Sequence, residues 1–278
     1  MSGASRGRVW IEALAGATNV ASSRPPSVLS ARALLGTEPV QYITVAPDAY
    51  ARFPRAREGE VGVEEGWALA AHVRGIIRAD AGVLRKQAIV AIVDVPSQAY
   101  GRREEQLGIH LALAAAVDAY ATARIAGHPI IALLVGKAMS GAFLAHGYQA
   151  NRIVALNDAG VQVQAMGKQA AARITRRTLE EVDALGDAAP PMSYRVDMFA
   201  RFGLVDVLLD GVAADTPGPT DVKRVQDVLA AQISALRASG ACDLRSRRDG
   251  ALGARHASLE VRRRLAAEWS DADSASHL

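Results

Sequence analysis

The sequence has very little cysteine and few aromatic residues. Cys242 is the single cysteine among 278 residues, which excludes an internal disulfide framework and a metal site built from several thiolates. We therefore expect no metal ion, and a reducing compartment such as the cytoplasm. Aromatic residues make up only 5 % of the chain, so the core must consist mainly of Ala, Val, Ile and Leu. Such side chains suit helices packed on parallel strands and favour an α/β fold.

Long apolar runs and an excess of one charge are also lacking. The apolar run Pro129–Val135 ends at Gly136-Lys137, far short of the roughly 20 residues that a membrane-spanning helix needs. The N-terminus lacks the apolar core of a secretion signal. With 32 basic and 29 acidic residues, the net charge of +3 is too balanced to indicate a nucleic-acid partner. We expect neither a membrane nor a nucleic acid as partner.

The middle of the chain repeats a regular pattern, and half of all residues are hydrophobic. Ala88–Asp94 is a continuous apolar run, typical of a strand buried on both faces. Glu105–Ala126 places apolar residues at steps of three and four, which predicts an amphipathic helix. Ile130–Val135 predicts a second buried strand, Gly136–Ser140 a turn, and Gly141–Gly147 the start of another helix. The unit of strand, polar turn and helix therefore recurs.

The same criteria place further elements on both sides of this unit. Strands are expected over Val40–Ala46, Arg152–Leu156, Val161–Met166 and Leu204–Leu209. Helices are expected over Glu64–Arg78, Gln169–Arg177, Leu179–Leu185, Met198–Phe202 and Val222–Arg237.

Composition divides the chain into three parts. Residues 1–38 are interpreted as an N-terminal docking arm, in which Arg32–Gly36 forms a short helical turn ending at glycine. Residues 39–240 form the main domain. Residues 241–278 form a basic helical tail, either solvated or serving as a surface for an acidic partner, and its end, Ser270–Leu278, is expected to be disordered.

The segment Gly136–Phe143 carries the most chemical information, because it lies between a buried strand and a helix start. Its small residues let the backbone turn sharply and let a ligand approach the main chain. The amides of a first helical turn have no intrahelical acceptor and attract developing negative charge. The alternative is that Gly141 and Ala142 are small only because the helix packs tightly on the sheet. The spacing of these residues is consistent with both an anion-binding turn and a closely packed helix.

Several motifs in order resemble the carboxyltransferase and crotonase-like superfamily. Gly136–Phe143 is similar to the loop that supplies backbone amides to a thioester oxyanion in that superfamily. Over roughly residues 40 to 235 the other matching motifs are Asp94-Val95-Pro96 with Gly101, Glu105 and Gly108, then Gly127-His128-Pro129, Asn151–Leu156, Gln164–Gly167 and Phe202–Asp206. The resemblance implies a crotonase-like (ClpP/crotonase) spiral of β-β-α units, followed here by a helical C-terminal extension.

Within the superfamily, the sequence resembles the malonate decarboxylase gamma-subunit family. This resemblance implies decarboxylation of malonyl-S-acyl carrier protein to acetyl-S-acyl carrier protein and CO₂, at a site shared with a beta subunit. The other implied partners are the acyl carrier protein (delta) subunit and the acyl carrier transferase (alpha) subunit. This chain would bind no cofactor itself, since the substrate is carried on the phosphopantetheine-type prosthetic group of the carrier.

The resemblance also implies roles for individual residues. The backbone N–H groups of Gly141 and Ala142 would stabilise the oxyanion, and Gly136 and Ser140 would shape the loop. Substrate binding is assigned to the neighbouring positions Lys137, Met139, Pro96, Ser97, Met166 and Gly167. The family's Pro-Gly and Gly-Gly pairs are replaced here by Pro96-Ser97 and Ser140-Gly141, which predicts a narrower pocket around the acyl arm.

Three other functions stay open from the sequence. A carboxyltransferase subunit of a biotin-dependent enzyme would use the same fold to move the carboxyl group to biotin. A non-catalytic assembly subunit would use the loop only for packing. Ser140, His146 and Asp158 are the residue types of a serine hydrolase, but Ala138 and Ala142 stand where a nucleophile elbow needs glycine.

Overall fold

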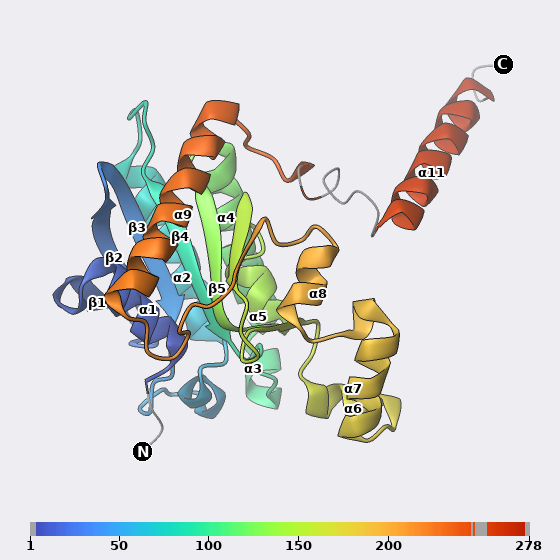
Figure 1. The fold of residues 1–278 in the computed structure, drawn as a ribbon, viewed down its shortest axis with the longest axis horizontal. Coiled ribbons are helices and arrows are strands. Elements are labelled where there is room, and N and C mark those ends of the chain that lie inside the picture. Colours follow the sequence, from blue (N-terminus) through green and yellow to red (C-terminus); the bar gives the residue numbers. More distant parts are fainter. Residues whose placement is uncertain (1–3, 246, 248–254, 276–278) are drawn as a thin grey trace.

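The computed structural model describes residues 4–245, 247 and 255–275, and a mixed sheet lies at its centre (Figure 1). Its strands follow the order β1-β2-β3-β4-β5-β6-β8, and β7 pairs with β5. Pairing is antiparallel from β1 to β3 and parallel from β3 to β8. The strands are β1 (Val20–Ser22), β2 (Val28–Leu35), β3 (Glu38–Val45), β4 (Ala88–Val95), β5 (Ile130–Met139), β6 (Arg152–Leu156), β7 (Gln162–Gln164) and β8 (Val207–Leu209).

Helices cover both faces of this sheet. In Figure 1, α9 crosses one face, while α2 and α4 pack together behind the other. The helices are α1 (Arg6–Ala15), α2 (Val63–Ala79), α3 (Arg102–Gln106), α4 (Ile109–Ile125), α5 (Ser140–Ala145), α6 (Lys168–Thr175), α7 (Leu179–Ala188), α8 (Val196–Arg201), α9 (Pro219–Ser239) and α11 (His256–Ala275). In the described part of the chain, none of these helices is both long and apolar enough to cross a membrane.

The central strands form the core, as their composition predicts. Every residue of β4 except Asp94 is buried, and so is every residue of β5 except Lys137. Both faces of these strands are covered by helices, so a continuous apolar run is stable there. The strands predicted over Ala88–Asp94, Ile130–Val135 and Arg152–Leu156 and the overall α/β architecture are confirmed.

Glycines explain two predictions of local structure that are wrong. The helical turn over Arg32–Gly36 is instead the end of β2, which pairs with β3 from Val28 to Leu35. Gly36, with φ of 64°, belongs to the turn of this hairpin and does not end a helix. The single helix over Glu105–Ala126 is interrupted, because Gly108 has φ of 75° and separates α3 from α4.

The N-terminal segment adds a helix that the sequence analysis missed. Helix α1 packs against β3, β4 and β5, and its Trp10 is fully buried and donates a hydrogen bond to the Ala214 carbonyl at 2.8 Å. Residues 4–38 therefore contribute to the same sheet and core as the rest of the chain. Their separate role as a docking arm, and the division at residues 38 and 240, stay predictions.

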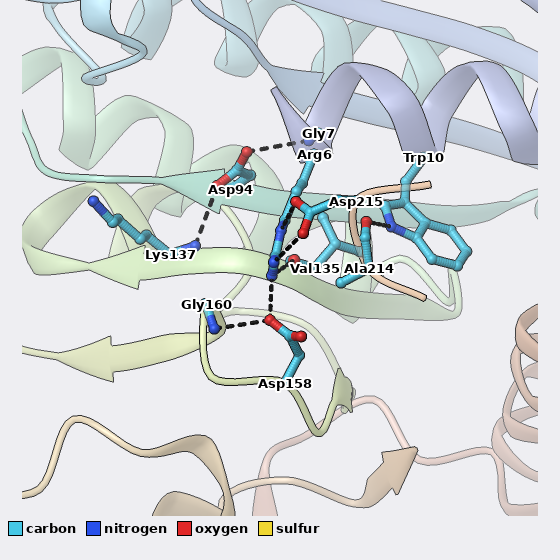
Figure 2. A network of polar contacts seen from close by, with 10 residues as sticks. All are labelled: Arg6, Gly7, Trp10, Asp94, Val135, Lys137, Asp158, Gly160, Ala214 and Asp215. Carbon is cyan, nitrogen blue, oxygen red and sulfur yellow. Dashed lines mark hydrogen bonds and ion pairs between the residues drawn. The ribbon is translucent and has the colours of Figure 1, made fainter. Parts of the chain in front are cut away.

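Arg6, the first residue of α1, ties this helix to distant parts of the chain (Figure 2). Its guanidinium donates to both Asp215 carboxylate oxygens at 2.7 and 2.9 Å, and to Asp158 Oδ1 at 2.7 Å. It also donates to the Val135 carbonyl at 3.1 Å, in the middle of β5. The hydrogen bond from Arg6 lowers the pKa of the Asp215 carboxyl. The Arg6 side chain therefore links α1 to three segments of the chain, those that contain Val135, Asp158 and Asp215.

The C-terminal segment is only partly the solvated tail that its basic composition suggests. Arg247 is buried and donates to the Tyr148 and Ala150 carbonyls, with its guanidinium over the Tyr148 ring. Helix α11 extends away from the body (Figure 1). Because α11 continues to Ala275, the expected disorder of Ser270–Leu278 is wrong for residues 270–275, and residues 276–278 lie outside the described residues.

Helix α2 contains two glycines with opposite expected responses to the same substitution. A β-carbon on Gly66 would lie 2.8–2.9 Å from the carbonyl group and β-carbon of Ala112 on α4, whereas one on Gly75 would meet no atom closer than 3.9 Å. We expect Gly66→Ala to lower the free energy of unfolding by about 1–3 kcal/mol, because α2 and α4 must separate. Gly75→Ala should raise it by about 0.5–1 kcal/mol through helix propensity.

Urea denaturation of both variants measures this difference. The two variants share one helix and one added methyl group, so each controls for the other. Equal effects of the same sign would contradict the close contact between α2 and α4.

Candidate active site

The candidate site is built around the junction at which β5 ends and α5 begins. The turn predicted over Gly136–Ser140 is wrong, because β5 continues to Met139 and pairs with β7 from Lys137 to Met139. Only Ser140 makes the turn, with φ of 61°, and α5 starts there. This strand–helix change places three consecutive amides, those of Ser140, Gly141 and Ala142, in the first helical turn. Helix geometry gives them no intrahelical acceptor.

Gly136 lies within the strand, and a neighbouring carboxylate explains why it is a glycine. A β-carbon at this position would lie 2.0 Å from Asp94 Oδ1. The Asp94 carboxylate accepts the Lys137 N–H at 3.2 Å and the Gly7 N–H of α1 at 3.2 Å (Figure 2). Asp94 therefore joins the ends of β4 and β5 to α1. Gly136 allows this close approach four residues before the junction.

A mostly apolar cavity of about 610 Å³ opens at the junction. Its lining comes from the junction, from β7 and the residue after it, from the segment around α8, and from the start of α11. The described residues that line it are Ser140, Gly141, Phe143, Leu144, Tyr148, Val163, Gln164, Ala165, Pro190, Pro191, Ser193, Phe199, Phe202, Leu204, Arg255, Ala257 and Ser258. A cavity of this size is typical of a small-molecule binding site.

Arg255 provides the charge in this lining among the described residues. Its Nε and Nη2 atoms are buried and have no hydrogen-bond partner. The cavity therefore combines apolar walls, main-chain amides at the junction and a guanidinium on the α11 side. This arrangement fits a ligand with an apolar body and at least one anionic group.

The structure brings only part of the predicted site together. Ser140 and Gly141 line the cavity, and Ala142 follows them with a fully buried side chain. The side chain of Met139 packs instead into a small core with Ala172, Val182 and Tyr194.

The other predicted binding residues lie outside the cavity lining. The side chain of Lys137 is exposed on β5. Pro96 and Ser97 are half-buried after β4, where the Ser97 carbonyl accepts the Val61 N–H at 3.0 Å. Met166 and Gly167 precede α6, and Gly167 is its N-cap. Their roles in substrate binding stay predictions.

Two residues near the junction were missed by the sequence analysis. The hydroxyl of Tyr100 lies 2.7 Å from Ser140 Oγ, and the side-chain oxygen of Gln98 lies against the α-carbon of Gly141. Both follow Pro96 and Ser97 in the same loop. The motif Asp94-Val95-Pro96 pointed to this loop, but only the tertiary fold shows which of its residues reach the junction.

The contacts of His146 exclude the serine-hydrolase arrangement. Its Nε2 lies 3.0 Å from the Ile92 carbonyl and its Nδ1 lies 3.0 Å from the Tyr120 hydroxyl. Since a carbonyl can only accept, Nε2 carries the proton and Nδ1 accepts from Tyr120. Asp158 is paired with Arg6, and Ser140 with Tyr100. The three hydrolase residue types therefore have separate partners.

Burial keeps His146 neutral as well. The side chain is fully buried, and this burial lowers its pKa to about 4, while burial raises the pKa of Tyr120. His146 is a packing residue that connects α5 to β4 and α4, and it does not reach the cavity as a proton donor.

The mixed sheet and its strand–helix junction define a fold of the crotonase-like carboxyltransferase class. A chain of transcarboxylase 12S superimposes with a TM-score of 0.60 over 82 % of this chain and 40 % of that chain. At 20 % identity this similarity establishes the fold alone. The crotonase-like fold expected from the sequence motifs is confirmed.

This chain belongs to the malonate decarboxylase gamma-subunit family, whose model matches residues 56–269. A chain of a Pseudomonas malonate decarboxylase hetero-tetramer, solved in complex with coenzyme A, is 54 % identical. That match covers 95 % of this chain and all of that chain, with a TM-score of 0.89. The family resemblance stated from the sequence is therefore confirmed.

A curated relative has a related activity. Malonyl-S-ACP:biotin-protein carboxyltransferase MADD of Malonomonas rubra is 37 % identical over 174 residues. The match spans 60 % of this chain and 60 % of that relative's length.

Proposed function

We propose that this chain acts with a beta subunit to decarboxylate malonyl-S-acyl carrier protein to acetyl-S-acyl carrier protein and CO₂. The observation that carries the proposal is the apolar cavity of about 610 Å³ that opens directly at Ser140 and Gly141. The proposal assigns the oxyanion to the N–H groups of Gly141 and Ala142, at the start of α5.

The chemistry requires stabilisation of one charge. When the bond between the α-carbon and the carboxylate breaks, CO₂ leaves and the bonding electrons move into the α-carbon and onto the thioester oxygen. The resulting enolate then takes up a proton at carbon to give the acetyl thioester. Amides aimed at the oxygen stabilise the enolate more than the neutral thioester, so they lower the barrier. Apolar walls such as Phe143 and Phe202 exclude water from the carboxylate and strengthen these hydrogen bonds.

The relatives support two of the proposed partners. The Pseudomonas chains come from a hetero-tetramer and from an MdcD-MdcE hetero-dimer, which supports a beta subunit as partner here. The name of the M. rubra relative supports an acyl carrier protein as the carrier of the malonyl group. We include the alpha subunit and a cytoplasmic location in the proposal, and no cofactor bound by this chain itself. Arg255 would face the phosphate of the carrier's prosthetic group.

A second function has specific support. The M. rubra relative transfers the carboxyl group to a biotin protein, according to its name. In that reaction the same enolate forms, but the carboxyl group moves to biotin and is not released directly. The junction amides would serve both reactions equally.

Reconstitution with the beta subunit and a malonyl-loaded carrier protein tests the proposal. We expect acetyl-S-carrier and CO₂ in equal amounts, at a rate that avidin does not change. Complete loss of turnover on addition of avidin would establish the biotin-dependent reaction instead. Turnover by the remaining subunits in the absence of this chain would show that the chain is a non-catalytic assembly subunit.

A further inference from the structure

We infer that Tyr100 is a positioning residue that acts through Ser140 to hold the junction amides in place. This inference rests on the proposed function, because it assumes that the amides of Gly141 and Ala142 receive the oxyanion. The residue assignments made from the sequence give a role to Pro96 and Ser97 of this loop but none to Tyr100. Three observations carry the inference: two contacts of this loop and the backbone conformation of Ser140.

The first contact is the hydrogen bond between the two hydroxyl groups. Tyr100 Oη lies 2.7 Å from Ser140 Oγ, and Ser140 is buried while the tyrosine is half-exposed. Tyr100 lies between β4 and α3, so this bond joins the end of one central strand to the end of the next. The side chain thereby connects the loop after β4 with the junction after β5.

The second observation is the backbone conformation of Ser140. Its φ of 61° lies in the left-handed region, which is unfavourable for residues with a β-carbon. Among the described residues other than glycine, Arg176 is the one further case of a positive φ. Strained conformations persist where the surroundings hold them, and the bond to Tyr100 is such a restraint. If this bond is lost, the peptide between Ser140 and Gly141 can rotate.

The third observation shows that the loop itself is fixed. Val61 donates to the Ser97 carbonyl at 3.0 Å and accepts the Ala99 N–H at 2.9 Å. From this short paired segment, Gln98 extends over Gly141, where a β-carbon would lie 2.1 Å from its side-chain oxygen. Gln98 and Tyr100 therefore contact two consecutive junction residues from a rigid support.

These contacts predict a specific kinetic effect. Rotation at Ser140 changes the direction of the amides that follow it, whereas the apolar walls that bind the acyl chain stay in place. Loss of the Tyr100 hydroxyl should therefore lower kcat and leave KM nearly unchanged. A residue with a purely structural role would change complex stability without this separation.

The test uses Tyr100→Phe, Ser140→Gly and the double variant in the reconstituted complex. We expect Tyr100→Phe to lower kcat about five-fold, as loss of one neutral hydrogen bond does, with KM within about two-fold. Ser140→Gly removes the same hydrogen bond together with the strain that favours rotation, so its kcat should fall by no more than that of Tyr100→Phe. In the Ser140→Gly background, Tyr100→Phe should then have no further effect. Ser140→Ala keeps the strain without the hydrogen bond and should be less active than Ser140→Gly.

Tyr50→Phe is the matched control, since Tyr50 is exposed and distant in sequence from the junction. Melting curves of each complex report whether the variants fold. The inference would be overturned if Tyr100→Phe lowered kcat equally in the wild-type and Ser140→Gly backgrounds. It would also be overturned if Tyr100→Phe left kcat unchanged while Ala142→Pro was inactive. An active Ala142→Pro complex would instead overturn the oxyanion assignment on which the inference rests.

Discussion

Replacing Ala142 with proline is expected to lower kcat for malonyl-thioester decarboxylation by about 10²–10³-fold, because it removes one oxyanion donor. Ala142 is the third residue of α5, so its N–H has no intrahelical acceptor and its loss breaks no helical hydrogen bond. The change acts on the transition state more than on substrate binding, so we expect kcat to fall more than KM rises. Steady-state kinetics of the reconstituted complex measure both.

Two controls separate the donor from other effects of the substitution. Ala142→Val adds a side chain of similar bulk at this fully buried position and keeps the N–H, so it measures crowding alone. Thr220→Pro introduces proline at a comparable place in the first turn of α9, a helix that contributes no described residue to the cavity lining. A folded Ala142→Pro complex as active as Ala142→Val would contradict the oxyanion role and would favour an assembly subunit.

Acidification from pH 6.5 to pH 4 is expected to cost roughly 3 kcal/mol of unfolding free energy through His146 alone. Burial lowers the pKa of this histidine to about 4, so the folded state binds its proton less readily than the unfolded chain does. The stabilisation is therefore fully present above about pH 6.5 and is lost as the pH falls through the folded pKa. Protonation would also remove the acceptor that Nδ1 offers to the Tyr120 hydroxyl.

Urea unfolding of the wild type and of His146→Gln at several pH values measures this contribution. Glutamine retains one donor and one acceptor but does not titrate, so its unfolding free energy should depend less on pH in this window. His110→Gln removes an exposed histidine from α4 and controls for the loss of one histidine as such. Parallel curves for the wild type and His146→Gln would refute the assignment of this acid sensitivity to His146.

The sequence predicted the centre of the fold better than its margins. Continuous apolar runs identified β4 and β5, because strands covered on both faces have no polar alternation. The same criterion missed α1, whose buried residues are mixed with charged ones such as Arg6 and Glu12. The sequence analysis also failed at Gly36 and Gly108. A glycine with a positive φ occurs in a hairpin turn and before a helix as well as after one, so the glycine alone did not identify the element.

In the candidate site, too, the sequence predicted some features and missed others. Order and spacing of motifs located the junction at Ser140 and Gly141, because short local motifs determine where a strand gives way to a helix. Local sequence did not predict that Met139 packs into the core, or that Tyr100 reaches Ser140 from 40 residues away. Such contacts depend on the register of parallel strands, which is set by packing between distant segments.

By itself, the sequence determined the family and the α/β class, since these follow from local pattern and motif order, and it proposed the amides of residues 141 and 142 as oxyanion donors. Only the tertiary structure decided which side chains surround those amides. The cavity joins residues at the end of β5, in β7 and around α8 with Arg255, and its lining extends along the chain from Ser140 to Ser258. Because parallel strands align their carboxyl ends at one edge, the fold gathers these segments, and no local pattern can specify which of their residues meet there.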